Sequence, residues 1–230
     1  MSLTTTTEGS STTPSKLQQE NEWVKVHHHR RGKKGNRRAR PVPKTNVADA
    51  VYVPSTPTLS LEQVRAEHER ISNQWKASGA YRRLMELLSK HSMKVNVTKA
   101  ICFGIGTFDP EDGSWEQKRK AHVQLAAFLA IVEHLRGVGT NTKAESEEKK
   151  KKGEIRCYFQ EPVFNAVDRA FVESLGPGGY QVVESPAGFD LVDDTALAFG
   201  VHLYRDVYTR IIAEHVPAMF VGTAYEVWQE

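Results

Sequence analysis

Short apolar runs alternate with helical patterns over the second half of the chain. The run at 99–103 leads into a glycine-bearing turn, and a helix that is apolar around more than half of its circumference follows at 117–136. Four further strands are predicted at 154–159, 180–184, 196–199 and 218–221. Two further helices are predicted at 163–175 and 203–212. Such alternation indicates parallel pairing through right-handed crossovers. The pattern predicts a Rossmann-like, doubly wound α/β fold with a mainly parallel five-stranded sheet in the order 3-2-1-4-5.

Two helices are predicted ahead of this domain. Ser60 to Gln63 has the form of a capping box, and apolar residues recur at helical spacing from there to Gly79. A second short helix follows at 81–88, and Trp75 and Tyr81 are interpreted as anchors of the helical packing. The predicted organisation is an arm at 1–57, a helical extension at 58–93 and the α/β domain at 94–230, with an exposed low-complexity loop at 140–153.

The N-terminal arm is predicted to be disordered and basic. Its first 20 residues are mostly Thr, Ser, Gln and Glu, so they bury too little apolar surface to offset the entropy of ordering. Residues 1–44 carry a net charge of +7, whereas the rest of the chain carries −4. The run Arg30–Arg40 fits a nuclear-localisation signal or an RNA-contacting arm as well as a solubilising tail. Nuclear import machinery or nucleic acid would therefore be met at this run.

The composition favours a cytoplasmic and nuclear protein without a membrane partner. No run approaches the roughly 18 apolar residues of a membrane-spanning helix, and the Thr- and Ser-rich start lacks the apolar block of a secretory signal. The cysteines, Cys102 and Cys157, lie inside apolar runs and are expected to be buried, reduced thiols.

A ligand-binding crevice is predicted at the carboxyl ends of the first and fourth strands, because ligands bind open parallel sheets where the strand order reverses. Glycines lack a Cβ atom, so a ligand can approach their backbone closely. The histidine after the fourth strand is either structural or an acid, base or hydrogen-bond donor, and the carboxylate after the second strand could accept bonds from a ribose. The candidate ligand-binding residues are Gly104, Ile105, Gly106, Thr107, Phe108, Glu161 and His202.

The sequence contains no complete catalytic set, so no catalytic residue, cofactor or metal site is assigned. A dinucleotide fingerprint needs a third glycine that opens the helix, but the turn continues from Asp109 to Ser114. The flexible triplet His27–His29 imposes no metal geometry. A non-enzymatic, ligand- or partner-binding module is the favoured hypothesis. The alternative is an S-adenosylmethionine-dependent methyltransferase-like enzyme that binds the ribose through Glu161.

Five motifs, in this order, resemble the Sensitivity to Red Light Reduced family. They are Ile101–Phe108, Gln124–Ala126, Gln160–Phe164, Gly200–Tyr204 and Phe220–Thr223. The resemblance implies a regulatory protein, connected in plant members with light signalling and circadian-clock control, and it implies no established reaction. Control of gene expression or growth through a bound ligand or protein partner is the expected role. The chain departs from the family pattern at Glu161, where an aspartate is common, and around His202, where a Pro-His-Cys-like stretch is usual.

Overall fold

The computed structural model describes residues 55–91, 95–140, 155–176 and 180–224. All of them belong to one compact unit, Lys44–Glu230. The predicted arm at 1–57 lies outside the described residues except for its last three, and the predicted loop at 140–153 lies outside them except for Thr140. Both therefore stay predictions, as does the boundary between the helical extension and the α/β domain.

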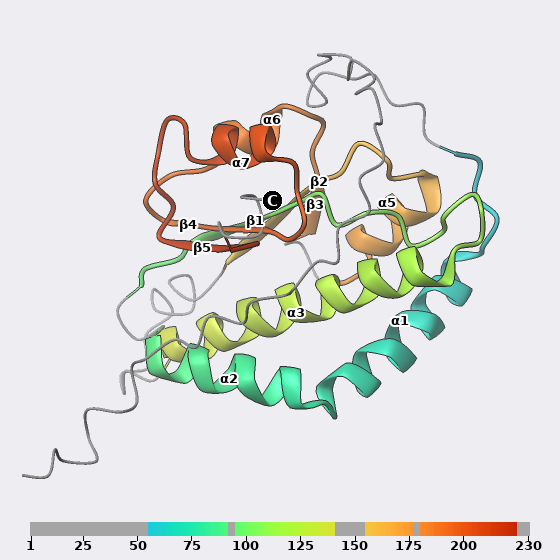
Figure 1. Ribbon diagram of the computed structural model, residues 1–230, viewed down its shortest axis with the longest axis horizontal. Helices are drawn as coiled ribbons and strands as arrows, with labels where there is room; N and C mark the ends of the chain where they lie inside the picture. The colour runs from blue at the N-terminus through green and yellow to red at the C-terminus, as the bar shows by residue number, and fades with distance from the viewer. Residues whose placement is uncertain (1–54, 92–94, 141–154, 177–179, 225–230) are drawn as a thin grey trace, which may run out of the picture. The chain divides into compact units, whose positions relative to one another are not determined.

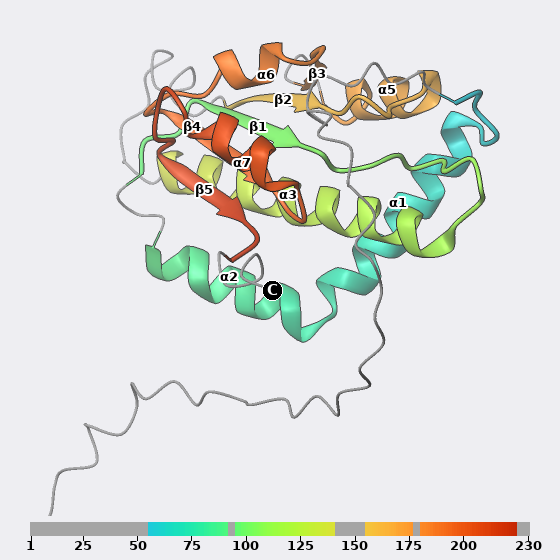
Figure 2. The ribbon, with the colours of Figure 1, turned by 45° about the horizontal axis from the view of Figure 1, so that its top comes forward.

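Within the described residues, five strands form a parallel sheet (Figure 1). They are β1 Lys99–Phe103, β2 Arg156–Gln160, β3 Tyr180–Val182, β4 Ala196–Gly200 and β5 Met219–Gly222. The strand order is β3-β2-β1-β4-β5, and every neighbouring pair is parallel. Figure 2 shows β3 and β5 at opposite edges. The predicted doubly wound α/β fold and the order 3-2-1-4-5 are confirmed.

The central strand β1 separates two apolar cores. Ala100 and Cys102 belong to the larger core, while Ile101 and Phe103 belong to the smaller one on the opposite face. Successive side chains of a strand point to opposite faces, so a strand covered on both sides reads as a continuous apolar run. This burial explains why 99–103 carries no polar alternation after Lys99.

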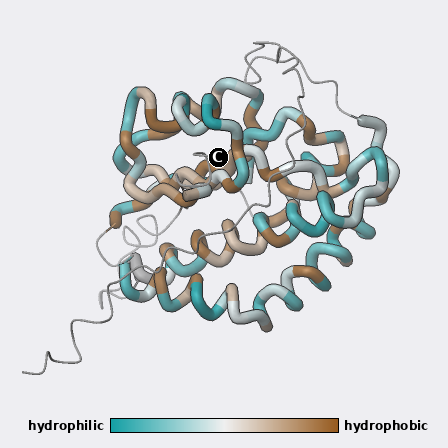
Figure 3. The backbone as a smooth tube through the Cα atoms, in the orientation of Figure 1, coloured by the Kyte–Doolittle hydropathy of each residue, from teal (hydrophilic) through white to brown (hydrophobic). Residues whose placement is uncertain are grey.

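In the part of the chain that the structure describes, four helices cover the face of the larger core. They are α1 Leu61–Lys76, α2 Gly79–His91, α3 Trp115–Thr140 and α5 Ala166–Glu173. Figure 1 shows α3 directly below the sheet and α1 and α2 beyond it, and both α1 and α2 contact α3. The Phe128 ring of α3 packs edge-on against Phe159 of β2 and Phe199 of β4, with centroids 5.2 and 5.6 Å away. Apolar positions therefore gather on the strands and on α3 (Figure 3).

Two short helices, α6 Ala187–Asp190 and α7 Arg205–Ile211, cover the opposite face (Figure 1). Phe103 of β1 stacks on Phe189 of α6 with ring centroids 5.2 Å apart. The amide of Gly188 donates to the Gln160 side chain over 2.7 Å, which ties α6 to the end of β2. Four residues are too few for a periodic pattern, so α6 was absent from the sequence prediction.

The helix starts follow local capping chemistry. Ser60 and Gln63 form the predicted capping box at α1. Asn165 and Asp168 form a second one at α5, so this helix begins three residues after the apolar stripe predicted at 163. At the junction of α1 and α2, Trp75 and Tyr81 pack edge to face with centroids 5.2 Å apart.

Cys102 and Cys157 are buried, free thiols, as predicted. Burial raises the pKa of the Cys157 thiol to about 11, and it raises that of Cys102 well above its usual value. In the described part of the chain, no helix has the length and apolar character needed to cross a membrane.

Candidate functional site

The carboxyl ends of β1 and β4, which the sequence predicts to lie together, are at the same end of the sheet. β1 and β4 are parallel neighbours with Cys102 opposite Phe199, so Gly104 and Gly200 follow at adjacent positions. The strand order reverses between these two strands, which is where open parallel sheets bind ligands. The candidate residues therefore come from loops at one edge of the sheet.

The gap between the two glycine tips is filled by a side chain of the protein itself. A Cβ atom at Gly104 would stand 2.1 Å from Cδ2 of Leu203, and one at Gly200 would stand 2.4 Å from its Cδ1. Leu203 is only 7% exposed and packs in the smaller core. The two glycines thus leave room for Leu203, a residue that the sequence analysis includes in a helical stretch and in the Gly200–Tyr204 motif.

Glu161 holds the loop Gly104–Asp109, which follows β1, through a hydrogen bond from the Gly106 amide. The Gly106 amide donates to its Oε2 over 2.7 Å, and the Val163 amide donates to its Oε1 over 3.2 Å. Glu161 is only 7% exposed. Desolvation raises its pKa, an effect that these hydrogen bonds oppose and the nearby Asp168 reinforces. Its carboxylate accepts one backbone amide on each oxygen.

A second buried carboxylate, Asp168 of α5, holds the next part of the loop. It accepts bonds from the Thr107 hydroxyl at 2.6 Å, from the Phe108 amide at 3.0 Å and from the Asn165 amide at 3.1 Å. Desolvation raises the pKa of Asp168 in spite of these bonds. Sequence reasoning missed this residue, although the Asn-x-x-Asp spacing at the start of α5 was the signal available.

Asp109 ties the end of the loop to the segment before α1. It accepts the amides of Thr58 and Leu59 at 2.6 and 3.0 Å, as well as the Thr58 hydroxyl. Burial alone would raise the pKa of Asp109, but the bonds from Thr58 and Leu59 outweigh it and the pKa is lowered. Three carboxylates therefore fix the Gly104–Asp109 loop.

The candidate loop residues divide between core and surface. Ile105 and Phe108 are buried in the larger core. Gly106 has a φ of +81°, and a Cβ atom there would meet open space within 4 Å. Gly104, Gly106 and Thr107 are the partly exposed candidate residues of this loop, and the Thr107 hydroxyl is bonded to Asp168.

His202 occupies a tight turn after β4. Its φ is +61°, its side chain is exposed, and its amide donates to the Thr223 hydroxyl over 2.7 Å. The Tyr208 hydroxyl braces the same turn by donating to the Gly200 carbonyl over 2.8 Å. Tyr208, like Leu203 and Asp168, is a residue that the sequence analysis does not connect with this end of the sheet.

Comparison with known proteins identifies the family. The model of the SRR1 domain, named for Sensitivity to Red Light Reduced, matches residues 84–230, more than half of the chain. This chain belongs to the SRR1 domain family. No curated protein and no solved structure matches it. The family supports a regulatory role related to light and clock signalling.

The SRR1 domain match begins inside α2 and includes every strand of the sheet. All seven candidate residues lie within it, whereas α1 precedes it. Within it, Glu161 follows the carboxyl end of β2 and His202 follows that of β4.

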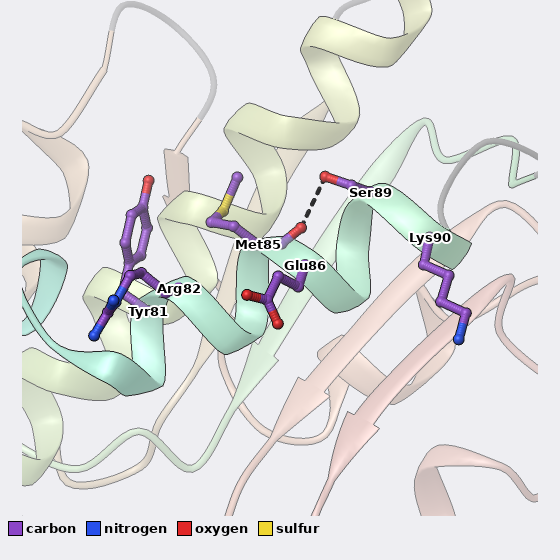
Figure 4. Close-up of a pocket in the computed structure, with 6 residues that line it drawn as sticks. All are labelled: Tyr81, Arg82, Met85, Glu86, Ser89 and Lys90. Carbon is purple, nitrogen blue, oxygen red and sulfur yellow. Dashed lines mark hydrogen bonds between the residues drawn. The ribbon is translucent and has the colours of Figure 1, made fainter. Parts of the chain in front are cut away.

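Hollows lined by described residues lie beside the candidate loop and along α2. One of about 490 Å³ is lined by Thr107 of the loop and by Ser55, Pro110, Glu111, Asp112 and Gln117. A second, of about 680 Å³, runs along α2 (Figure 4), where the Ser89 hydroxyl donates to the Met85 carbonyl. Among the described residues, no group of three or more His, Cys, Asp or Glu side chains is placed to hold a metal ion.

Proposed function

We propose that this SRR1 domain protein regulates gene expression or growth by binding a ligand or protein partner at the carboxyl edge of its sheet. The observation that carries the proposal is the family match over residues 84–230. The geometry supports binding, because the carboxylate-fixed loop leaves Gly106 and Thr107 partly exposed and the turn after β4 exposes His202. A site on a rigid scaffold binds with little loss of conformational entropy.

The buried carboxylates favour a neutral or cationic occupant over a phosphate. In Rossmann folds, backbone amides of the first loop donate hydrogen bonds to anions. Here the Gly106 and Phe108 amides donate to Glu161 and Asp168 instead. An incoming phosphate would have to displace an internal carboxylate and would meet its negative charge.

The test replaces the exposed histidine in the organism that carries this gene. We expect His202→Ala to reproduce the transcript and growth changes of a gene deletion while the protein accumulates normally, because the side chain is exposed and does not pack in either core. His91→Ala, at another exposed histidine at the end of α2, is the matched control and should behave as wild type. Normal regulation by His202→Ala would remove this residue from the site.

The enzymatic alternative is tested by calorimetric titration of the purified chain with S-adenosylmethionine. Both carboxylate oxygens of Glu161 already accept a backbone amide, which makes a ribose contact unfavourable. We therefore expect no heat of binding at millimolar ligand. Binding that Glu161→Gln abolishes would establish the methyltransferase-like reading in place of the proposed one.

The proposal extends to the cell: the protein acts in both nucleus and cytoplasm, with nuclear entry directed by the basic run Arg30–Arg40, which lies outside the described residues. A fluorescent fusion that lacks this run is expected to lose its nuclear fraction. An unchanged distribution would show that the run is not a targeting signal.

A further inference from the structure

Two histidines meet where α1 packs on α3. His68 of α1 and His122 of α3 approach with their Nδ1 atoms 3.3 Å apart. The His122 side chain is 0% exposed. Such a contact needs one nitrogen to donate and the other to accept, so at least one ring must be neutral.

The surroundings of this pair are largely aromatic. The His122 ring lies 5.0 Å from Phe108 of the candidate loop, and the His68 ring lies 5.4 Å from Phe171 of α5, measured between centroids. Neither ring can solvate a positive charge as water does. A proton added to the pair would therefore be poorly solvated and would convert the contact into two facing N–H groups.

The charged neighbours do not offset that penalty. Glu67 of α1 lies 3.9 Å from Nε2 of His122, but Lys118 of α3 already pairs with the same carboxylate at 3.2 Å. Arg70 and Lys118 act on His122, and Lys76 acts on His68, all as like charges. The carboxylate of Asp168, on α5, accepts a hydrogen bond from the Phe108 amide.

Burial of the two rings has the expected electrostatic effect. Desolvation, aided by these cations, lowers the pKa of His68 to about 4 and that of His122 to about 3. An imidazole released into water titrates near 6.5. Below that pH, the detached helix binds protons that the docked helix excludes, so acid favours detachment.

We propose that the His68–His122 pair is an acid-released latch: the neutral imidazoles hold α1 against α3 and α5, and protonation of the pair detaches α1. The latch joins α1, which precedes the family match at 84–230, to α3, which lies within that match. It also reaches the candidate site, because release would uncover Phe108 and pull on the Thr58–Asp109 bonds of the same loop.

The test is amide hydrogen exchange of the full chain between pH 6.5 and 4.5, expressed as protection factors so that the pH dependence of intrinsic exchange is removed. For each proton taken up on opening, the equilibrium constant for detachment of α1 should rise about tenfold for every unit by which the pH falls. The protection of β1 and β4 should change little. This range lies above the titration of Asp109, whose lowered pKa keeps it charged, so its bonds to Thr58 and Leu59 persist.

Two variants separate the latch from other acid-sensitive groups. The double variant His68→Leu/His122→Phe removes both titrations but keeps Glu161 and Asp168, and its α1 protection should be independent of pH. His68→Asn, at the less buried position, keeps a polar group beside Nδ1 of His122 and should lessen the slope. If the double variant fails to fold, the slope of His68→Asn decides.

Either of two results would overturn the latch. One is an equal acid loss of α1 protection in wild type and variants. The other is a His122 ring that titrates above pH 6 in the folded chain, followed by NMR, while α1 stays protected.

Discussion

Gly104 and Gly106 lie two residues apart in the same loop, and both have a left-handed φ, of +62° and +81°. Their surroundings differ. A Cβ atom at Gly104 would overlap Leu203, whereas one at Gly106 would enter open space. The pair therefore separates backbone strain from steric overlap within one loop.

We predict that Gly104→Ala destabilises the fold more than Gly106→Ala. The left-handed backbone costs either alanine about 1 kcal/mol. Overpacking against Leu203 adds about 1–3 kcal/mol at Gly104 alone. Urea denaturation of both variants measures the difference, and equal losses would show that Leu203 moves aside freely.

The pKa of Glu161 gives a pH-dependent prediction. Because its folded pKa is raised, its stabilising contribution is fully present below the unfolded value of 4.5 and is lost as pH rises through the folded pKa. Glu161→Gln removes this dependence. The stability gap between this variant and wild type, measured by urea denaturation, should therefore be largest below pH 4.5 and should narrow as the pH rises above it.

Glu62 supplies a control of opposite sign. Its backbone and Ser60 hydrogen bonds lower its pKa, so its contribution is present above pH 4.5 and is lost in acid. The gap between wild type and Glu62→Gln should widen slightly with rising pH. If both glutamate variants responded alike, burial would not be the cause of the Glu161 shift.

Residue types and positions at the site were predictable, but their partners were not. The strand that ends before Pro162 placed Glu161 at the sheet edge, yet its bond to Gly106 joins residues 55 positions apart. Likewise, the pattern placed two glycines at strand tips, and only packing shows that Leu203 stands between them. Sequence periodicity predicts which face of the strand or helix a side chain lies on. It does not predict which distant residue that side chain contacts.

At the scale of elements, α1 begins at a capping box that the sequence already indicated. The Ser60 hydroxyl accepts the Gln63 amide, and the Gln63 side chain accepts the Ser60 amide. We predict that Ser60→Ala costs about 1 kcal/mol and lowers the hydrogen-exchange protection of α1.

Ser89→Ala in α2 is the matched control. The Ser89 hydroxyl donates to the carbonyl of Met85, four residues earlier, which is not a cap and contributes little to helix stability. The control should leave stability unchanged or slightly raised. If the two serine variants lost equal stability, the capping box would not be what fixes the start of α1.

Elements with strong local signals matched their predictions, and weak ones shifted. The strand predicted at 99–103 is β1, Lys99–Phe103, because an apolar run between a lysine and a glycine turn leaves one reading. The third strand is shorter than predicted, at Tyr180–Val182, because pairing with β2 limits it. The helix predicted at 117–136 is longer than predicted, at Trp115–Thr140, because it continues through Gly137 and Gly139.

At the scale of the whole molecule, the strand order was predictable because right-handed crossovers leave few topologies for this alternation. The packing of α1 and α2 on α3 was expected only in outline. Which helix meets which depends on contacts such as His68 with His122, between residues 54 positions apart. These contacts bear on where the folding unit begins.

The family segment, residues 84–230, is shorter than the unit that the contacts define. It starts within α2 and omits α1, which packs on both α3 and α5. We therefore predict that a fragment 84–230 unfolds at lower urea concentration than a fragment 55–230 and binds a dye for exposed apolar surface, because Phe108 and Phe171 lose their cover. The fragment 55–230 keeps the Thr58–Asp109 bonds and should match the full chain. Equal stability of the two fragments would mean that α1 does not stabilise the sheet domain. The contact between His68 and His122 could then be lost without effect on the sheet.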